Sequence, residues 1–183
     1  MDKKSKKIYA LKEMMKFKII DKKSEISIMY ERELLCRIQH PFVVNMHFTF
    51  QDHLYLIMDY LSGGDLRYHL CKYRTFTEKQ TKFFIACIIL ALDYLYHKQI
   101  IHRDIEPENL VLDDKGYLRL TDFGIAKFYQ INNYHETSGT PGYMSPEVMK
   151  GLNHSYTADY FALGVIGYEF MLGKVNTNYL TSF

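Results

Sequence analysis

The chain has 183 residues, 48% of them hydrophobic and 24% charged, which is ordinary for a globular domain with one buried core. Lys and Arg number 23 and Asp and Glu 21, so the net charge of +2 does not favour nucleic acid or a membrane surface as a partner. Three widely spaced cysteines predict neither a disulfide framework nor a zinc site. They favour a reducing compartment, cytoplasmic with a nuclear alternative.

Strand-like segments dominate the first third of the chain. Residues 8–20 predict a strand that runs into a loop, and residues 24–38 predict a helix with Ser24 as its N-cap. Residues 42–50 and 54–60 are rich in β-branched and aromatic side chains and predict a pair of strands.

Helices are expected after residues 61–64, where Leu-Ser-Gly-Gly interrupts the strand pattern. Thr77 and Gln80 match a capping box, which predicts that a helix begins there. The apolar residues that follow at helical spacing are Phe83, Phe84, Cys87, Ile88, Ala91, Leu92 and Leu95. The change from strands to helices suggests two lobes that meet near residues 63–64.

Two more elements are expected in the second half of the chain. Residues 109–120 predict a short hairpin that turns at residues 113–116. Residues 156–172 predict a largely apolar helix that Gly173 ends. The apolar run over residues 83–96 is shorter than the roughly 20 residues that a bilayer span needs, so it is interpreted as a buried helix.

The strongest chemical signal is H-R-D at residues 102–104, followed by Asn109 and by D-F-G at residues 122–124. Phosphoryl transfer needs a carboxylate that orients the attacking hydroxyl, and oxygen donors that hold magnesium. Asp104 supplies the first, and Asn109 with Asp122 supplies the second. The expected hairpin brings these residues together, so the set predicts a phosphoryl-transfer centre.

With G-T-P at residues 139–141 and S-P-E at residues 145–147, this set resembles the signature of a eukaryotic serine/threonine protein kinase domain. The chain is similar to the AGC-type enzymes. Its segments at residues 63–70 and 91–95 look closest to the YANK kinases. The resemblance covers most of the chain and implies an α+β, bilobal protein-kinase-like fold in partial form.

The resemblance implies one partial domain, with an incomplete β-rich small lobe in residues 1–60 and an incomplete, mainly helical large lobe in residues 61–183. No glycine precedes Gly63, so the glycine-rich loop that covers the phosphates is expected to be absent. The later helices of the large lobe are expected to be absent as well. Glu147 would then lack the arginine that family members pair with it, and part of the apolar helix at 156–172 would lack cover.

ATP and Mg²⁺ are the cofactors that the resemblance implies. The positions that match catalytic residues of the family are Asp104, Lys12, Glu31, Arg103, Asn109 and Thr140. The positions that match its nucleotide-binding residues are Lys12, Ala10, Met58, Asp59, Tyr60, Leu61, Asp65, Val111 and Asp122. The implied metal ligands are Asn109 and Asp122. The stacked spine that links the lobes is matched by Leu35, Met46, His102 and Phe123, with Asp159 beneath it.

The helical pattern gives Glu31 separate support. It falls between Ile28, Leu35 and Ile38 on one face of its helix, and a carboxylate on an apolar face is costly unless it is paired. A pair with Lys12, the position that matches the phosphate-binding lysine, would satisfy it. A glutamate at the edge of the apolar stripe is the alternative.

Glu106 departs from the family pattern. Serine/threonine kinases place a lysine there, and tyrosine kinases place an arginine four residues after the catalytic Asp, where this chain has Glu108. An anion near the transferring phosphate should raise the barrier. The other motifs still lead to the interpretation of the chain as a serine/threonine kinase. A pseudokinase that binds nucleotide or acts as a scaffold, and a truncated product that does not fold, are the alternatives.

Two further groups of acids bear on regulation and substrates. Glu136 matches a position where many AGC kinases carry a phosphothreonine that pairs with the residue matching Arg103. Its carboxylate is expected to replace part of that charge, with an exposed loop glutamate as the alternative. Asp65, Glu108 and Glu169 match the acids that receive substrate arginines in cAMP-dependent kinase. They predict protein substrates with basic residues before the acceptor, with independent exposed roles as the alternative. The oligomeric state is left open.

Overall fold

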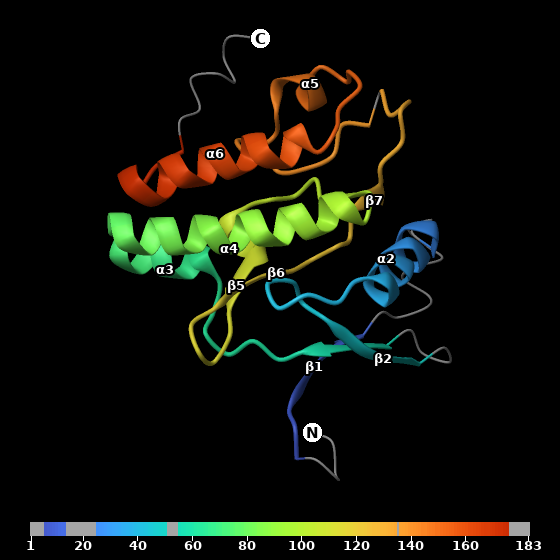
Figure 1. Cartoon of the computed structure of the whole chain (residues 1–183), viewed down its shortest axis with the longest axis horizontal. Helices are drawn as coiled ribbons and strands as arrows, with labels where there is room; N and C mark the ends of the chain where they lie inside the picture. Colours follow the sequence, from blue (N-terminus) through green and yellow to red (C-terminus); the bar gives the residue numbers. More distant parts are fainter. Residues whose placement is uncertain (1–5, 14–24, 51–54, 135, 176–183) are drawn as a thin grey trace.

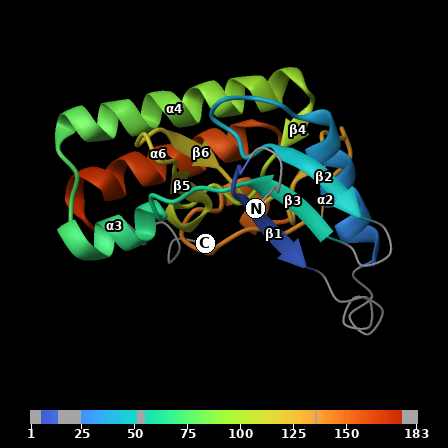
Figure 2. The same cartoon turned by 90° about the horizontal axis from the view of Figure 1, so that it is seen from below.

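Three antiparallel strands and one helix form the small lobe, which lies in the lower part of Figure 1. Its elements are β1 (Tyr9–Glu13), α2 (Glu25–Arg37), β2 (Met46–Phe50) and β3 (Tyr55–Asp59). The strands lie in the order β1-β3-β2 (Figure 2), with Lys12 opposite Leu56. The computed structural model describes residues 6–13, 25–50, 55–134 and 136–175.

Helices dominate the rest of the chain, which forms the large lobe. Its elements are α3 (Leu66–Tyr73), α4 (Glu78–His97), β4 (Ile100–Ile101), the 3-10 turn η1 (Pro107–Asn109), β5 (Leu110–Leu112), β6 (Leu118–Leu120), β7 (Lys127–Phe128), α5 (Pro146–Met149) and α6 (Thr157–Leu172). Helices α4 and α6 run side by side in both views (Figures 1 and 2). Among the described residues, no helix combines the length and the apolar character that a bilayer span requires.

Two helix ends follow the expected local signals. The Thr77 hydroxyl accepts a hydrogen bond from Gln80 N at 3.3 Å, and the Gln80 side chain accepts one from Thr77 N at 3.0 Å, which confirms the capping box. Gly173 ends α6 in left-handed backbone with φ of 70°, and its N–H donates to Glu169 O. A side chain at Gly173 would meet Arg74 O at 2.6 Å, so both conformation and space favour glycine there.

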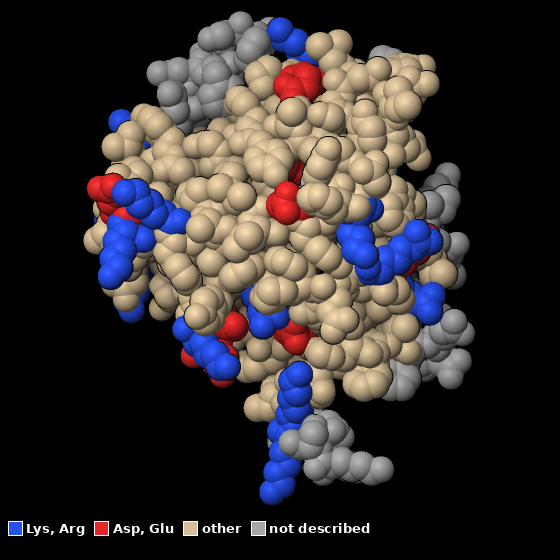
Figure 3. Space-filling view, in the orientation of Figure 1, with Lys and Arg blue, Asp and Glu red and all other residues tan. Residues whose placement is uncertain are grey.

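The core of the large lobe lies between α4 and α6. The expected stripe of α4 is buried from Phe84 to Leu95, whereas Phe83, which was assigned to the same stripe, is 41% exposed. Phe76 packs edge-to-face against both Phe84 and Phe170, with ring centroids 5.2 and 5.1 Å apart. Burial of such side chains contributes about 1.5–3 kcal/mol each. The outer face over these helices carries few charges (Figure 3).

The expected hairpin, formed by β5 and β6, joins the two lobes. Leu112 exchanges two backbone hydrogen bonds of 2.9 Å with residues 63–64. Leu120 exchanges two more, also of 2.9 Å, with residues 42–44. The hairpin thus contacts the lobe junction on one strand and the small lobe on the other, and the predicted bilobal arrangement is confirmed.

Some boundaries differ from the expectation. The first strand of the predicted pair is shorter, since the β2 ladder starts at Met46 and residues 42–44 bond to the hairpin instead. Ser24 and residues 14–20 lie outside the described residues. The two-residue strands β4 and β7 and the one-turn helix α5 were not predicted, because elements that short carry no readable period.

Candidate active site

A cleft of about 410 Å³ brings together residues from both lobes. Its lining residues are Ala10, Lys12, Glu31, Leu35, Val44, Met58, Asp59, Tyr60, Leu61, Val111, Thr121, Asp122 and Phe123. Every residue predicted to bind nucleotide is among them except Asp65. A cleft of this size, with apolar walls and a few charged groups, is typical of a small-molecule site.

Lys12 of β1 and Glu31 of α2, which both line the cleft, form an ion pair. Lys12 Nζ lies 2.6 Å from Glu31 Oε1, and the Glu31 side chain is 5% exposed. The expected contact is present, and it compensates a carboxylate that would otherwise be buried alone. Lys12 Nζ also lies 3.8 Å from Asp122 Oδ1. The ammonium group therefore stands between a buried and an exposed carboxylate.

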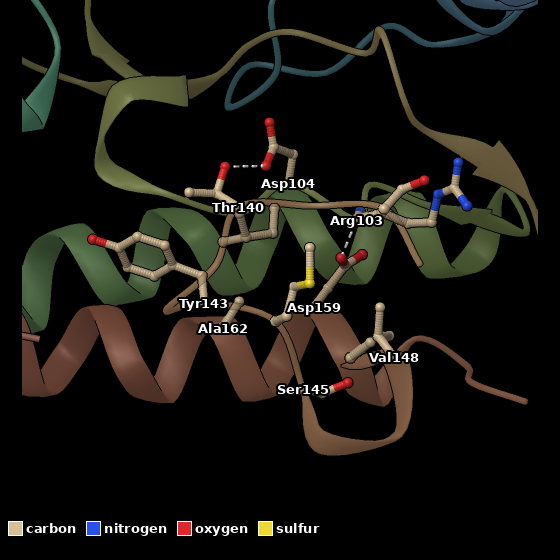
Figure 4. Close-up of a pocket in the computed structure, with 12 residues that line it drawn as sticks. Arg103, Asp104, Thr140, Tyr143, Ser145, Val148, Asp159 and Ala162 are labelled. Carbon is tan, nitrogen blue, oxygen red and sulfur yellow. Dashed lines mark hydrogen bonds between the residues drawn. The ribbon is translucent and has the colours of Figure 1, made fainter. Parts of the chain in front are cut away.

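A buried carboxylate holds the loop at residues 102–104 from the side of α6. Asp159 accepts hydrogen bonds from His102 N and Arg103 N, both at 2.8 Å, and Figure 4 shows Asp159 reaching toward the Arg103 backbone. Arg103 has φ of 72°, a strained conformation for a non-glycine residue. Burial raises the pKa of Asp159, although His102 and Arg103 oppose that shift.

His102 connects this loop to the D-F-G segment. Its ring packs edge-to-face on Phe123 with centroids 4.9 Å apart, as the expected stack requires. Complete burial lowers the pKa of His102, so the ring is neutral at pH 7. One nitrogen must then donate and the other accept. Nε2–H donates to Thr121 O at 3.0 Å, and Nδ1 accepts from Asp104 N at 3.3 Å.

Asp104 has both carboxylate oxygens oriented by hydrogen bonds. Oδ1 accepts from Thr140 Oγ1 at 2.9 Å (Figure 4), and Oδ2 accepts from Asn109 Nδ2 at 3.0 Å. The first contact depends on a close approach at Gly139, where a side chain would meet Arg103 O at 2.7 Å. A carboxylate oriented in this way can position a hydroxyl group.

Asn109 and Asp122, the expected metal ligands, are brought near each other by the hairpin. Thr121 donates from its N–H and its hydroxyl to Asn109 O, at 2.8 and 3.1 Å. The Asn109 amide nitrogen binds Asp104, so the amide oxygen is the atom left for a cation. The Asp122 side chain is 56% exposed. An amide oxygen and an exposed carboxylate are hard donors, and the two residues fit magnesium.

Two of the residues predicted to bind nucleotide use their side chains for structure. The Asp59 carboxylate binds Asn45 Nδ2 at 3.0 Å, His47 Nε2 at 2.7 Å and Arg119 Nη1 at 3.2 Å. The Asp59 side chain is therefore engaged within the protein, and its backbone N–H donates to Asn45 O at 3.0 Å. The side chain of Asp65 caps the first turn of α3 by accepting a backbone N–H.

The segment at residues 122–147 is tied to the loop through Glu136. Arg103 Nη1 lies 2.6 Å from Glu136 Oε2, and Lys127 Nζ lies 2.7 Å from Glu136 Oε1. Burial alone would raise the pKa of Glu136, but Lys127 and Arg103 outweigh it and lower that pKa. The expected contact with Arg103 is present. Lys127 is a second cation that sequence reasoning missed.

Glu106 is half-buried beside this centre. Burial raises the pKa of Glu106; a hydrogen bond with Thr140 opposes the shift, and the charges of Asp104 and Glu108 add to it. Thr140 has a single hydroxyl proton, so it can donate to only one of the two carboxylates at a time. Glu106 therefore competes with Asp104 for the same donor.

Glu108 and Glu169, expected to receive substrate arginines, are already paired within the chain. Arg67 Nε lies 2.7 Å from Glu108 Oε1, and Arg67 Nη1 lies 2.5 Å from Glu169 Oε1. The Tyr143 hydroxyl donates to Glu169 Oε2 and accepts from Arg67 Nη2. Sequence reasoning missed Arg67, because an arginine in the first turn of a helix carries no signal of its own.

This fold and this set of residues define a protein kinase domain. The chain matches the protein kinase domain family over residues 1–179 and belongs to that family. It is 43% identical to a chain of Dictyostelium discoideum described as a probable serine/threonine-protein kinase, over 93% of this chain and 38% of the relative. It is also 43% identical to the cAMP-dependent protein kinase catalytic subunit of Schizosaccharomyces pombe, over 90% of this chain and 33% of the relative.

A third relative, the serine/threonine-protein kinase Sgk1 of Homo sapiens, is 43% identical over 90% of this chain and 39% of its own length. The chain thus spans between 33 and 39% of these relatives. The predicted resemblance to serine/threonine kinases of the AGC type is confirmed at this level. The particular likeness to the YANK kinases stays a prediction.

Proposed function

We propose that this chain transfers a phosphoryl group from ATP to serine or threonine of protein substrates, with magnesium as the cofactor. The observation that carries the proposal is the geometry of Asp104, whose carboxylate oxygens bind Thr140 and Asn109. His102 links the backbone of Asp104 to the segment at residues 121–123 that lines the cleft. A residue that orients a hydroxyl therefore adjoins a site suited to a nucleotide.

The main groups of the site have roles in this proposal that their contacts support. Asp104 orients the acceptor hydroxyl, and Thr140 keeps the Asp104 carboxylate in place. Lys12, held by Glu31, binds the phosphates. Magnesium, when bound, neutralises charge on the phosphates, and Asn109 with Asp122 would hold it. The residues proposed to surround the base and ribose are Ala10, Met58, Asp59, Tyr60, Leu61, Asp65 and Val111.

A nucleotide-binding module without turnover is the second candidate, and Glu106 favours it. Neither position 106 nor position 108 supplies a cation to the transferring phosphate. The loss of one favourable charge contact and the addition of a repulsion would slow transfer by about 10²-fold.

The setting and substrates belong to the proposal as well. A reducing compartment, cytoplasmic with a nuclear alternative, is part of the proposal, because the three cysteines are widely spaced in the sequence. Proteins are the proposed partners. The predicted preference for substrates with basic residues before the acceptor depends in part on Glu108 and Glu169. Both of these acids are bound to Arg67.

Thermal melting with and without Mg-ATP, followed by a phosphate-transfer assay on serine and threonine peptides, separates the candidates. An enzyme shows an ATP-dependent shift and transfer. Asp104→Asn should keep the shift and lose the transfer, while Asp122→Asn should lose the magnesium-dependent part of the shift. A shift without transfer identifies the binding module. A cooperative transition without a shift contradicts nucleotide binding, and no cooperative transition identifies a chain that does not fold alone.

A further inference from the structure

Arg67 joins three elements beside the catalytic loop. It lies in the first turn of α3, Glu108 lies in η1 four residues after Asp104, and Glu169 lies near the end of α6. Arg67 Nε lies 2.7 Å from Glu108 Oε1, and Arg67 Nη1 lies 2.5 Å from Glu169 Oε1. Because Nη2 binds the Tyr143 hydroxyl, all three guanidinium nitrogens have partners.

The two acids differ in what they can still offer to a cation from outside. The Glu169 side chain is 5% exposed, and both of its oxygens are engaged, Oε1 with Arg67 and Oε2 with the Tyr143 hydroxyl at 2.6 Å. A second cation can reach Glu169 only by displacing Arg67. The Glu108 side chain is 46% exposed and binds Arg67 through Oε1 alone.

Arg67 keeps its positive charge over the usable pH range. Burial alone would lower the pKa of Arg67, but the hydrogen bonds with Glu169 and Glu108 outweigh it and raise that pKa. Burial and the hydrogen bond to Glu169 also raise the pKa of Tyr143, so its hydroxyl stays protonated and donates to the carboxylate. Arg67 and Tyr143 therefore keep the protons that these hydrogen bonds need.

We propose that Arg67 is a specificity-determining residue that neutralises Glu108 and Glu169 from within the chain and so removes selection for a basic residue in the substrate. The inference rests on the proposed function, because it concerns the peptide that presents the acceptor. A guanidinium gains most from a bidentate contact with a desolvated carboxylate. Arg67 already makes that contact, and the exposed oxygen of Glu108 is screened by solvent and salt.

Peptides that differ only by arginine or citrulline test this directly, because citrulline keeps the shape and loses the charge. Each peptide carries either arginine or citrulline at a single position, one to four residues before a serine. Binding is measured by fluorescence anisotropy and transfer by kcat/KM. The wild-type chain should favour arginine by less than about threefold. Arg67→Met should raise that ratio to about tenfold or more at one position, through affinity rather than kcat.

Arg67→Lys is the matched control, since it keeps the charge and should keep the ratio within about threefold of wild type. In the double variant Arg67→Met, Glu169→Gln, the arginine-to-citrulline ratio should return to the wild-type level, because the buried acid is absent. A ratio that Arg67→Met leaves unchanged overturns the proposal. So does a wild-type ratio above about tenfold that Glu169→Gln abolishes, because the substrate would then contact Glu169 directly. This second comparison needs no Arg67 variant and holds even where Arg67→Met does not fold.

The two readouts separate this inference from the proposed function. Anisotropy requires no turnover, so it tests Arg67 even in a chain that only binds peptide. If transfer fails for every peptide while the binding ratios follow the pattern above, the proposed transfer is wrong and the role of Arg67 stands. If transfer occurs and Arg67→Met leaves both ratios unchanged, the role of Arg67 is wrong and the proposed function stands.

Discussion

The guanidinium of Arg103 bonds to Glu136 across 33 positions of the chain, at 2.6 Å, and the Arg103 side chain is 7% exposed. The backbone N–H of the same arginine is bound to Asp159 of α6. Arg103 is therefore fixed from two directions, by Asp159 of α6 and by Glu136 of the segment at residues 122–147. A buried guanidinium without its carboxylate is costly, so the geometry of the loop depends on residue 136.

Glu136→Ala is expected to loosen residues 122–147 and to lower phosphoryl transfer by about tenfold or more, because Arg103 loses a buried partner. Limited proteolysis and transfer rates measure the two effects. Lys127→Met is the matched control. Lys127 binds the other oxygen of Glu136 but is 42% exposed, so its loss should change stability by less than about 1 kcal/mol. If Glu136→Ala changes neither observable, Thr137 becomes the better candidate for control of this segment.

Glu106→Lys is expected to raise the transfer rate by about tenfold or more, because a cation replaces an anion beside the transferring phosphate. Glu106→Gln removes the charge alone and should give an intermediate rate. The measurement is kcat at saturating ATP. Asp114→Lys makes the same charge change at an exposed turn of the hairpin and should leave kcat unaltered. A rate for Glu106→Lys at or below wild type would count against the charge argument.

Glu106 also predicts a pH dependence of the stability and of the transfer rate. The folded pKa of Glu106 lies above its ordinary value of 4.5, so its contribution to stability is complete below pH 4.5 and is lost as the pH rises through the raised pKa. Lowering the pH from neutrality protonates the carboxyl and removes the repulsion. The rate ratio of Glu106→Gln to wild type should therefore shrink as the pH falls. A ratio that stays constant with pH would show that the ionisation of Glu106 is irrelevant to transfer.

Glu31→Gln is expected to weaken Mg-ATP binding by about tenfold, because Lys12 loses its nearest anion and is drawn toward Asp122 instead. The ATP-dependent shift of the melting temperature measures it. Glu33→Gln is the matched control on the same helix, since Glu33 is 48% exposed and forms a surface pair with Arg37. Equal effects of the two substitutions would contradict a specific role for Glu31.

The last turns of α6 predict self-association of the 183-residue chain. Tyr168, Met171 and Leu172 are 38, 43 and 53% exposed. Exposed apolar patches drive association, so the chain should associate and melt below about 50 °C. Met171→Lys with Leu172→Glu should raise the monomer fraction in light scattering, whereas Ile131→Glu, at a separate exposed site, should not. A monodisperse wild-type monomer with a sharp melt above about 50 °C would show this prediction wrong.

Local signals account for the parts of the fold that the sequence could predict. Thr77 and Gln80 satisfy each other's backbone groups three residues apart, and Gly173 meets a backbone requirement at a single position. The residues of the candidate site were found for a different reason. Motifs with fixed spacing mark them, and the short hairpin at residues 109–120 brings the spaced ends together.

The contacts of Arg67 and Asp59 follow no such rule. Arg67 binds acids 41 and 102 positions away, and charge pairing at such distances is decided by how α3, η1 and α6 pack. Asp59 was predicted as a nucleotide-binding residue from the family resemblance, and it lines the cleft. The three donors that hold its carboxylate come from separate strands and loops, so no pattern along the chain could reveal them.

Because the Asp59 carboxylate bonds to small-lobe residues and to Arg119 of the hairpin at once, it connects the two lobes at this end of the cleft. A rotation of the small lobe about this point moves nearby atoms little and distant atoms more. Tyr9 lies opposite Asp59 in the sheet, and Lys12 lies three residues further along β1, or about 10 Å away at the rise of a strand. With such a rotation, the end of the cleft at Lys12 would open wider than the end at Asp59, so phosphates would gain and lose their contacts before a base held near Asp59 does.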